Sequence, residues 1–108
     1  MASDEVLRSL REFVAERDWA QFHTPASLAR SIVIESAELL EHFQWDEEHD
    51  RQTVLDELAD VATYALLLAD ALDADLDEVV LAKLERTKAK YPVEKARGRS
   101  TKYDQLQD

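Results

Sequence analysis

The chain has 108 residues, a length typical of one small domain, and its 45% content of hydrophobic residues excludes a disordered tail. Cysteine is absent, which excludes a disulfide framework and thiolate metal sites. The net charge of −11 argues against general nucleic-acid binding. Since no stretch resembles a signal peptide or a membrane span, we expect a cytoplasmic protein with no membrane partner.

The predicted elements are all helices. One glycine and two prolines allow few sharp turns, so the sequence predicts an all-α fold of the four-helix-bundle type. The helices are expected over residues 3–17, 25–43, 52–72 and about 75–91. Thr24 can cap the second helix, because Pro25 follows it at the first helical position. Residues 93–108 predict a polar, extended tail, and with no dividing linker residues 1–108 are expected to form a single domain.

The second and third predicted helices share one layout, an apolar stripe flanked by two acids three residues apart. At about 100° per residue, Glu35 and Glu38 adjoin one stripe, and Glu57 and Asp60 adjoin the other. The stripes are Leu28, Ile32, Leu39 and Phe43 on the second helix, and Val54, Leu58, Val61, Ala65, Leu68 and Leu72 on the third. A short connection makes the two helices antiparallel neighbours, so packing through the stripes gathers four carboxylates.

Four clustered carboxylates must be protonated or neutralised, and Mg²⁺ prefers oxygen ligands. We therefore expect a divalent metal site, the alternative being solvated acids that pair with a partner chain. A ferritin-like di-iron centre requires Glu-x-x-His on two helices. His42 instead lies four residues after Glu38, and the third helix has no matching histidine, so iron is disfavoured.

Charge is unevenly distributed along the chain. Residues 35–60 hold ten acids and one base, whereas residues 83–102 hold eight of the thirteen basic residues. The acidic segment could bind a metal and the basic segment an anion, although two solvated faces would give the same pattern.

Aromatic residues lie near the ends of the acid-bearing helices or on the same stripe, namely Trp19, Phe22, Trp45 and Tyr64. They could stack on a planar base, or they could be ordinary core and loop anchors. His23 and His42 are equally open between a hydrogen bond to a base edge and a solvated position.

The second helix has another apolar side, formed by Val33, Ile34 and Leu40. A helix that is apolar on two sides must be covered on both. Four helices of this length can hardly supply that cover. We therefore expect a homo-oligomer, a dimer or tetramer, to complete the core.

Several segments then carry a resemblance that extends from about residue 6 to 104. They are a Glu-x-x-Glu and a Glu-x-x-Asp separated by eighteen residues, "FVAERDWAQFHTP" (13–25), "FQW" (43–45), "DELADVATY" (56–64) and "KYPVEKARG" (90–98). In this order and spacing they resemble the all-α nucleoside triphosphate pyrophosphohydrolases, the MazG-like group, and within it the dCTP pyrophosphatase branch.

The resemblance implies that a nucleoside triphosphate, dCTP or a modified dCTP, is cut between its α- and β-phosphates. The products would be a monophosphate and pyrophosphate. The implied cofactor is Mg²⁺, with Mn²⁺ as an alternative. By residue it implies Glu35, Glu38, Glu57 and Asp60 as metal ligands, Trp19, His23, Trp45 and Tyr64 as the base pocket, and Lys83, Lys90 and Tyr91 near the phosphates. Two departures bear on the preferred base: Thr87 stands where the family often has Asn, and the connection between the acid-bearing helices is shorter than in some relatives.

Phosphoryl transfer requires mainly positioning and charge neutralisation, which suits these residues. Glu38, with Glu35 beside it, is the expected catalytic carboxylate, because it could orient the attacking water or accept its proton. Two alternatives remain open. One is a non-enzymatic acidic helical module that oligomerises, and the other is a related pyrophosphohydrolase that prefers dUTP or damaged nucleotides.

Overall fold

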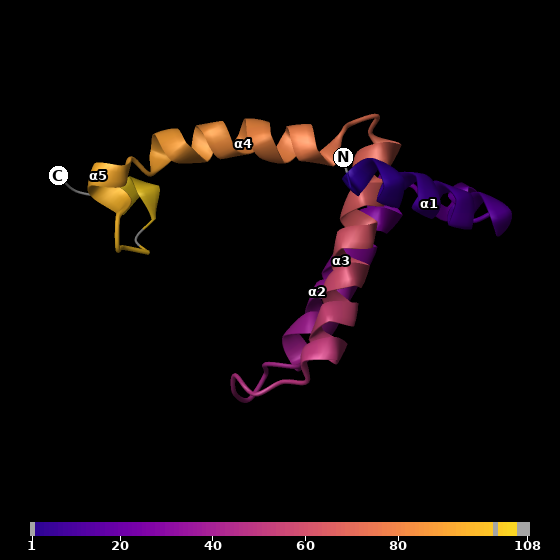
Figure 1. Ribbon diagram of the computed structural model, residues 1–108, viewed down its shortest axis with the longest axis horizontal. Coiled ribbons are helices and arrows are strands. Elements are labelled where there is room, and N and C mark those ends of the chain that lie inside the picture. Colours follow the sequence, from indigo (N-terminus) through magenta and orange to yellow (C-terminus); the bar gives the residue numbers. More distant parts are fainter. Residues whose placement is uncertain (1, 101, 106–108) are drawn as a thin grey trace. The chain divides into compact units, whose positions relative to one another are not determined.

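The computed structural model describes residues 2–100 and 102–105, and every regular element among them is helical. The elements, most of them labelled in Figure 1, are α1 (Ala2–Glu16), η1 (Ala20–Phe22), α2 (Pro25–Glu41), α3 (Arg51–Ala71), α4 (Leu76–Lys90), α5 (Val93–Ala96) and η2 (Tyr103–Gln105). The predicted all-α class is therefore confirmed. No helix in the described ranges is both long and apolar enough to cross a bilayer.

Two compact units make up the chain, Met1–Leu76 and Asp77–Asp108. The first unit holds α1, η1, α2 and α3, and the second holds α5, η2 and all but the first residue of α4. That the whole chain acts as a single domain stays a prediction.

Local capping explains where the two longest helices begin. The side chain of Thr24 accepts a hydrogen bond from the backbone N–H of Ser27 at 3.1 Å, and Pro25 occupies the first position of α2, as predicted. Asp50 caps α3 in the same way, accepting from the N–H of Thr53 at 3.1 Å. Both caps satisfy backbone donors that a helix start leaves unpaired.

A left-handed residue ends α1. Asp18 has φ 55°, and its N–H donates to the carbonyl of Ala15 at 3.1 Å. The N–H of Trp19 then donates to the carbonyl of Val14 at 3.0 Å, which completes a Schellman-type cap. This reversal brings the ring of Trp19 against the ring of Phe13, edge to face, with centroids 5.5 Å apart.

The end of α3 repeats this arrangement. Asp73 also has φ 55°, and its N–H donates to the carbonyl of Asp70 at 3.0 Å. The N–H of Ala74 donates to the carbonyl of Ala69 at 2.8 Å. Both turns have aspartate where glycine is preferred, so the usual glycine signal for a helix C-terminus is absent at these two positions.

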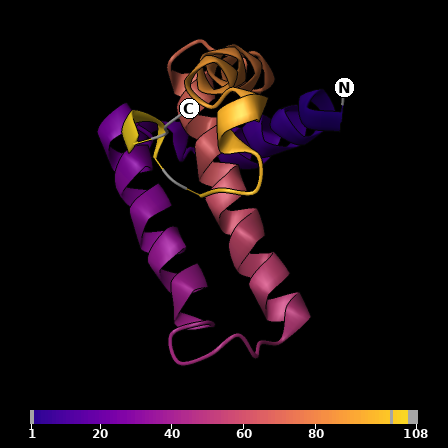
Figure 2. The ribbon, with the colours of Figure 1, turned by 90° about the vertical axis from the view of Figure 1, so that its left-hand side faces the viewer.

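Figure 2 shows α2 and α3 as an antiparallel pair joined by the loop of residues 42–50. α1 packs on the C-terminal half of α3, where Arg11 forms an ion pair with Asp70. The small core consists of Val14, Leu28 and Leu67, with Leu10, Tyr64 and Leu68 packed against it.

The apolar stripe predicted for α3 is only partly right. Leu68 contacts the core, but Leu58 and Leu72 are 49% and 60% exposed. Leu67, outside the predicted stripe, is buried instead. The reason is that α1 covers the side of α3 that carries Leu67, and helical periodicity alone cannot show which side a third helix will cover.

Residues 93–96 form the short helix α5, where the sequence predicted an extended tail. Pro92 precedes it with φ −57° and ψ 142°, and the N–H of Ala96 donates to the carbonyl of Pro92 at 2.9 Å. A proline that fixes the entry dihedral favours such a single helical turn.

Candidate functional site

A cluster of carboxylates lies between α2 and α3. Glu35, Glu57 and Asp60 each offer an oxygen, and these oxygens lie within 4.8 Å of one another. Oε2 of Glu35 and Oε2 of Glu57 are buried and have no hydrogen-bond partner among the described residues. A buried carboxylate oxygen without a partner is costly, and a hard cation with oxygen ligands would relieve that cost. The donor set therefore fits a divalent metal ion.

Glu38, the fourth acid of the predicted set, lies on the exposed edge of this cluster. It hydrogen-bonds to Glu35, and this bond is the main cause that raises the pKa of Glu35 to about 7. Burial of Glu35 adds to the effect, followed by the negative charges of Glu38, Asp60 and Glu57. The raised pKa means that the metal-free cluster takes up a proton as the pH falls through about 7, and a bound cation would compete with that proton.

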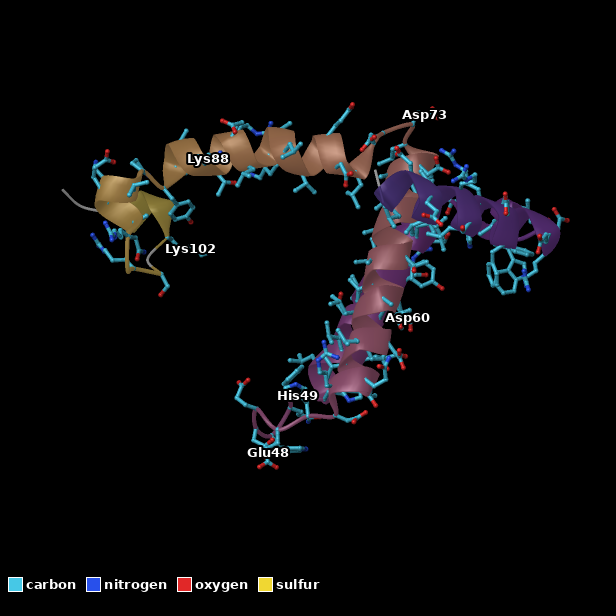
Figure 3. The ribbon with its side chains drawn as sticks, viewed as in Figure 1. Glu48, His49, Asp60, Asp73, Lys88 and Lys102 are labelled. Atoms are coloured by element: carbon cyan, nitrogen blue, oxygen red, sulfur yellow. The ribbon has the colours of Figure 1, made fainter. Side chains whose placement is uncertain are left out.

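A cavity of about 370 Å³ adjoins the cluster, and Asp60 belongs to both. Figure 3 shows Asp60 on α3. Three residues predicted for a base pocket, Trp19, His23 and Tyr64, line this cavity. The structure thus places one acid of the cluster, Asp60, on the wall of a cavity that aromatic rings also line.

Five further lining residues were not predicted as site residues: Leu10, Phe13, Val14, Thr63 and Leu67. On α3, Asp60, Tyr64 and Leu67 follow one another at helical spacing, so extending the acid-bearing stripe would have found Thr63 and Leu67. The residues of α1 could not be found in this way, because their sequence pattern predicts only a helix with an apolar face.

A second cavity, of about 230 Å³, lies nearby within the same unit. It shares Val14, His23 and Leu67 with the first cavity, and Arg11 and Asp70 also line it. His23 thus stands in the wall between the two cavities.

Other predicted residues lie elsewhere in the chain. Trp45 is in the loop between α2 and α3, is 88% exposed and does not line either cavity. Lys83, Lys90 and Tyr91 belong to the second unit, at or just after α4. Their roles toward base and phosphates stay predictions.

His42, for which the sequence left the role open, lies beside the acidic cluster. Its Nε2 is 3.6 Å from Oε1 of Glu57. The imidazole therefore faces a carboxylate of the predicted metal site and does not line the aromatic cavity.

Comparison with known proteins gives concordant matches. The model of the MazG-like family matches residues 30–106. dCTP pyrophosphatase 1 of Bos taurus is 39% identical over 113 residues, and the match covers 95% of this chain and 67% of that protein. The Homo sapiens protein of the same name is 37% identical, with 95% and 66% covered. The chain thus spans about two thirds of the length of these curated relatives.

A solved structure agrees with these matches. The crystal structure of a pyrophosphatase from Archaeoglobus fulgidus superposes with a TM-score of 0.76 at 42% sequence identity. The superposition covers 85% of this chain and 94% of the archaeal chain.

Proposed function

The chain belongs to the MazG-like family, and we propose that it is a metal-dependent nucleoside triphosphate pyrophosphohydrolase. Its substrate would be a deoxynucleoside triphosphate, dCTP or a modified dCTP, as the names of the relatives suggest. Water would cleave the P–O–P linkage between the α- and β-phosphates. The products are a nucleoside monophosphate and pyrophosphate, and the chemistry would serve to clear the nucleotide pool.

The observation that carries the proposal is the position of Asp60. Its carboxylate belongs to the acidic cluster with Glu35 and Glu57, and it also lines the aromatic cavity. A nucleotide whose base lies in that cavity would therefore direct its phosphates toward the cluster. An acidic interaction module would not require a cavity and buried unpaired oxygens at one place.

Each acidic residue has a proposed task. Glu35, Glu57 and Asp60 would hold Mg²⁺, with Mn²⁺ as an alternative, and Glu38 would complete the set. The ion, when bound, supplies positive charge that neutralises the carboxylates and the phosphate oxygens. Glu38, more exposed and hydrogen-bonded to Glu35, is placed to orient the attacking water or to accept its proton.

The cavity would select the base. Trp19 and Tyr64 offer aromatic surface for stacking, and His23 offers a ring nitrogen for a hydrogen bond to the base edge. Trp45 is a further proposed base contact, and Lys83, Lys90 and Tyr91 are proposed to bind the phosphates. A lysine ammonium suits this task, since it neutralises the charge of the leaving pyrophosphate.

We also propose a homo-oligomer, a dimer or tetramer, whose interfaces cover the apolar surface that the single chain leaves exposed. Val33, Ile34 and Leu40 on α2 are 69%, 57% and 66% exposed. We also propose a cytoplasmic location, which is compatible with a nucleoside triphosphate substrate. Neither nucleic acid nor membrane is a proposed partner.

The test is a panel of nucleotides with and without Mg²⁺, with products separated by chromatography. We expect dCTP or a 5-modified dCTP to give monophosphate and pyrophosphate in equal amounts, and only with the metal. A preference for dUTP or for a damaged nucleotide would keep the reaction and change the substrate. Absence of hydrolysis across the panel would refute the enzyme and favour the interaction module.

Matched variants locate the site. Glu57→Gln and Asp60→Asn should abolish turnover while the helical circular dichroism spectrum is kept. Asp56→Asn removes a charge one residue from Glu57, where Asp56 contacts Gln52 and lies outside the cluster. This control should retain activity, and equal losses in all three variants would show that the cluster is not the reaction centre.

A further inference from the structure

The loop after α2 begins with a histidine directed at the acidic cluster. Nε2 of His42 lies 3.6 Å from Oε1 of Glu57, and the two side chains are 26% and 22% exposed. This half-buried environment strengthens the attraction between them relative to a surface pair. A positive imidazole would attract this carboxylate strongly, and the N–H dipole of a neutral imidazole would attract it more weakly.

The two oxygens of Glu57 have different surroundings. Oε1 faces His42, whereas Oε2 is buried with no hydrogen-bond partner among the described side and main chains. A charge or dipole beside one carboxylate oxygen favours those orientations of the terminal torsion, which is otherwise broad, that keep this oxygen near it. The contact with His42 therefore leaves Oε2 as the oxygen available to a cation.

The backbone of His42 is itself fixed. His42 is the C-cap residue of α2, and its N–H donates to the carbonyl of Leu39 at 3.3 Å. Glu57 is in the second turn of α3, so the contact links the end of one helix to the start of the next. The hydrogen-bonded backbone of His42 therefore restricts where its imidazole can lie relative to the cluster.

We propose that His42 is a positioning residue that orients Glu57 so that Oε2 is presented to the metal ion. This inference rests on the proposed metal-dependent function. Carboxylates that bind metals are usually held by hydrogen bonds or charges from outside the ligand set, and loss of such a partner typically costs roughly 10- to 100-fold in metal affinity. His42 supplies such a partner for one ligand of the cluster.

The test measures metal binding without nucleotide. The thermal midpoint of the full-length protein is followed as Mg²⁺ is added, and the concentration that gives half of the maximal shift is compared between variants. We expect His42→Ala to raise this concentration by about 10-fold or more. His42→Gln should recover much of the loss, because its side-chain amide carries N–H donors at similar reach.

His49→Ala is the matched control, in the same loop and with the same side chain removed; Figure 3 labels His49 there. Nδ1 of His49 lies 2.8 Å from the carbonyl of Glu47, and its ring packs near Phe43 with centroids 4.9 Å apart. It has no ion pair to the cluster among the described contacts. We expect its Mg²⁺ midpoint to equal that of the wild type.

Three results would overturn the inference. One is an unchanged or lower Mg²⁺ midpoint for His42→Ala, and another is an equal loss in His49→Ala. The third is a selective loss of Mn²⁺ with Mg²⁺ unaffected, since that would make the imidazole a metal ligand. A metal-free midpoint and a circular dichroism spectrum measured for each variant separate loss of fold from loss of metal.

Enzyme kinetics give a second measurement. At saturating Mg²⁺, His42→Ala should regain most of the wild-type kcat, because all four carboxylates remain. Should the wild type bind Mg²⁺ but hydrolyse no nucleotide, the proposed reaction fails while the role of His42 can still be decided. Should it hydrolyse nucleotides while His42→Ala binds Mg²⁺ normally, only the role of His42 fails.

Discussion

Two individual oxygen atoms distinguish this acidic cluster from a row of surface acids. Oε2 of Glu35 and Oε2 of Glu57 come from different helices, and both are buried without a hydrogen-bond partner in the described part of the chain. A buried polar atom without a hydrogen-bond partner usually costs about 1–3 kcal/mol of folding free energy. Such atoms are therefore expected where another interaction offsets this cost. Here that compensation would be a cation at the meeting point of α2 and α3.

The first prediction concerns the stability of the metal-free protein as a function of pH. The pKa of Glu35 is raised to about 7 in the folded chain, by the hydrogen bond to Glu38 first and by burial next. The folded state therefore binds this proton more tightly than the unfolded state, and the stability it contributes is complete below about pH 4.5. That contribution should be lost as pH rises through 7.

The measurement is the thermal midpoint in EDTA between pH 5 and pH 8. Glu35→Gln should show a smaller decline than the wild type, because glutamine does not titrate. Mg²⁺ added at pH 8 should restore the midpoint of the wild type. Glu41→Gln, an exposed change on the same helix, is the control, and parallel curves for Glu35→Gln and wild type would contradict the prediction.

The second prediction concerns Trp19. Stacking of a base on an aromatic ring is worth about 1–3 kcal/mol, so Trp19→Ala should weaken binding of a non-hydrolysable dCTP analogue by roughly 10- to 100-fold. Calorimetry in Mg²⁺ measures this. Phe22→Ala removes an exposed ring from the same connection, outside the cavity, and should leave affinity unchanged. Equal effects of both changes would place the base elsewhere.

At the scale of elements, the turns that end the helices position residues of the candidate site, as the helices themselves do. Asp18 turns the chain at the end of α1, and the next residue, Trp19, then reaches the cavity wall. Asp73 performs the same turn at the end of α3. Neither position contains glycine, so each turn is held against the preference of an L-residue.

The third prediction follows from Asp73, which Figure 3 labels at the end of α3. Its φ is 55°, a value that glycine adopts without steric cost and that alanine adopts only at a cost in free energy. Asp73→Gly should therefore be more stable to unfolding than Asp73→Ala by about 1 kcal/mol. Urea denaturation followed by circular dichroism compares them. If alanine were as stable as glycine, the turn would not be left-handed in solution.

The sequence predicted the start of a helix well where a capping residue marks it. Thr24 with Pro25 fixed the start of α2, and the paired acids identified the facing sides of α2 and α3. It could not predict the burial of Leu67, because that depends on α1, a separate helix whose packing site leaves no local pattern. The residues of α1 that line the cavity were missed for the same reason.

At the scale of the whole molecule, much apolar surface remains exposed. The face of Val33, Ile34 and Leu40 on α2 was expected from the sequence, and the structure leaves it exposed in the single chain. Monomeric proteins rarely present large contiguous apolar patches. Lys83 and Lys90 belong to the second unit, and helical spacing predicts neighbours within one element and not between units, so their proximity to the site stays a prediction.

The fourth prediction is that the protein assembles through this face. Light scattering at micromolar concentration should give a mass of at least twice 12.4 kDa. Ile34→Glu should shift the particle toward the monomer, because a charge in an apolar interface is desolvated without a partner. Arg8→Glu, an exposed polar change on α1 away from this face, is the control. A wild-type particle of 12.4 kDa would contradict the prediction.

The two tryptophans of the chain lie in unlike surroundings, one in the cavity against Phe13 and the other almost fully exposed in the loop. The protein therefore carries two fluorophores that a collisional quencher can tell apart. In Trp45→Phe, the remaining emission would come from Trp19 alone. Its intensity would then report the arrival of a nucleotide base directly, in an unlabelled protein and without any chemical turnover.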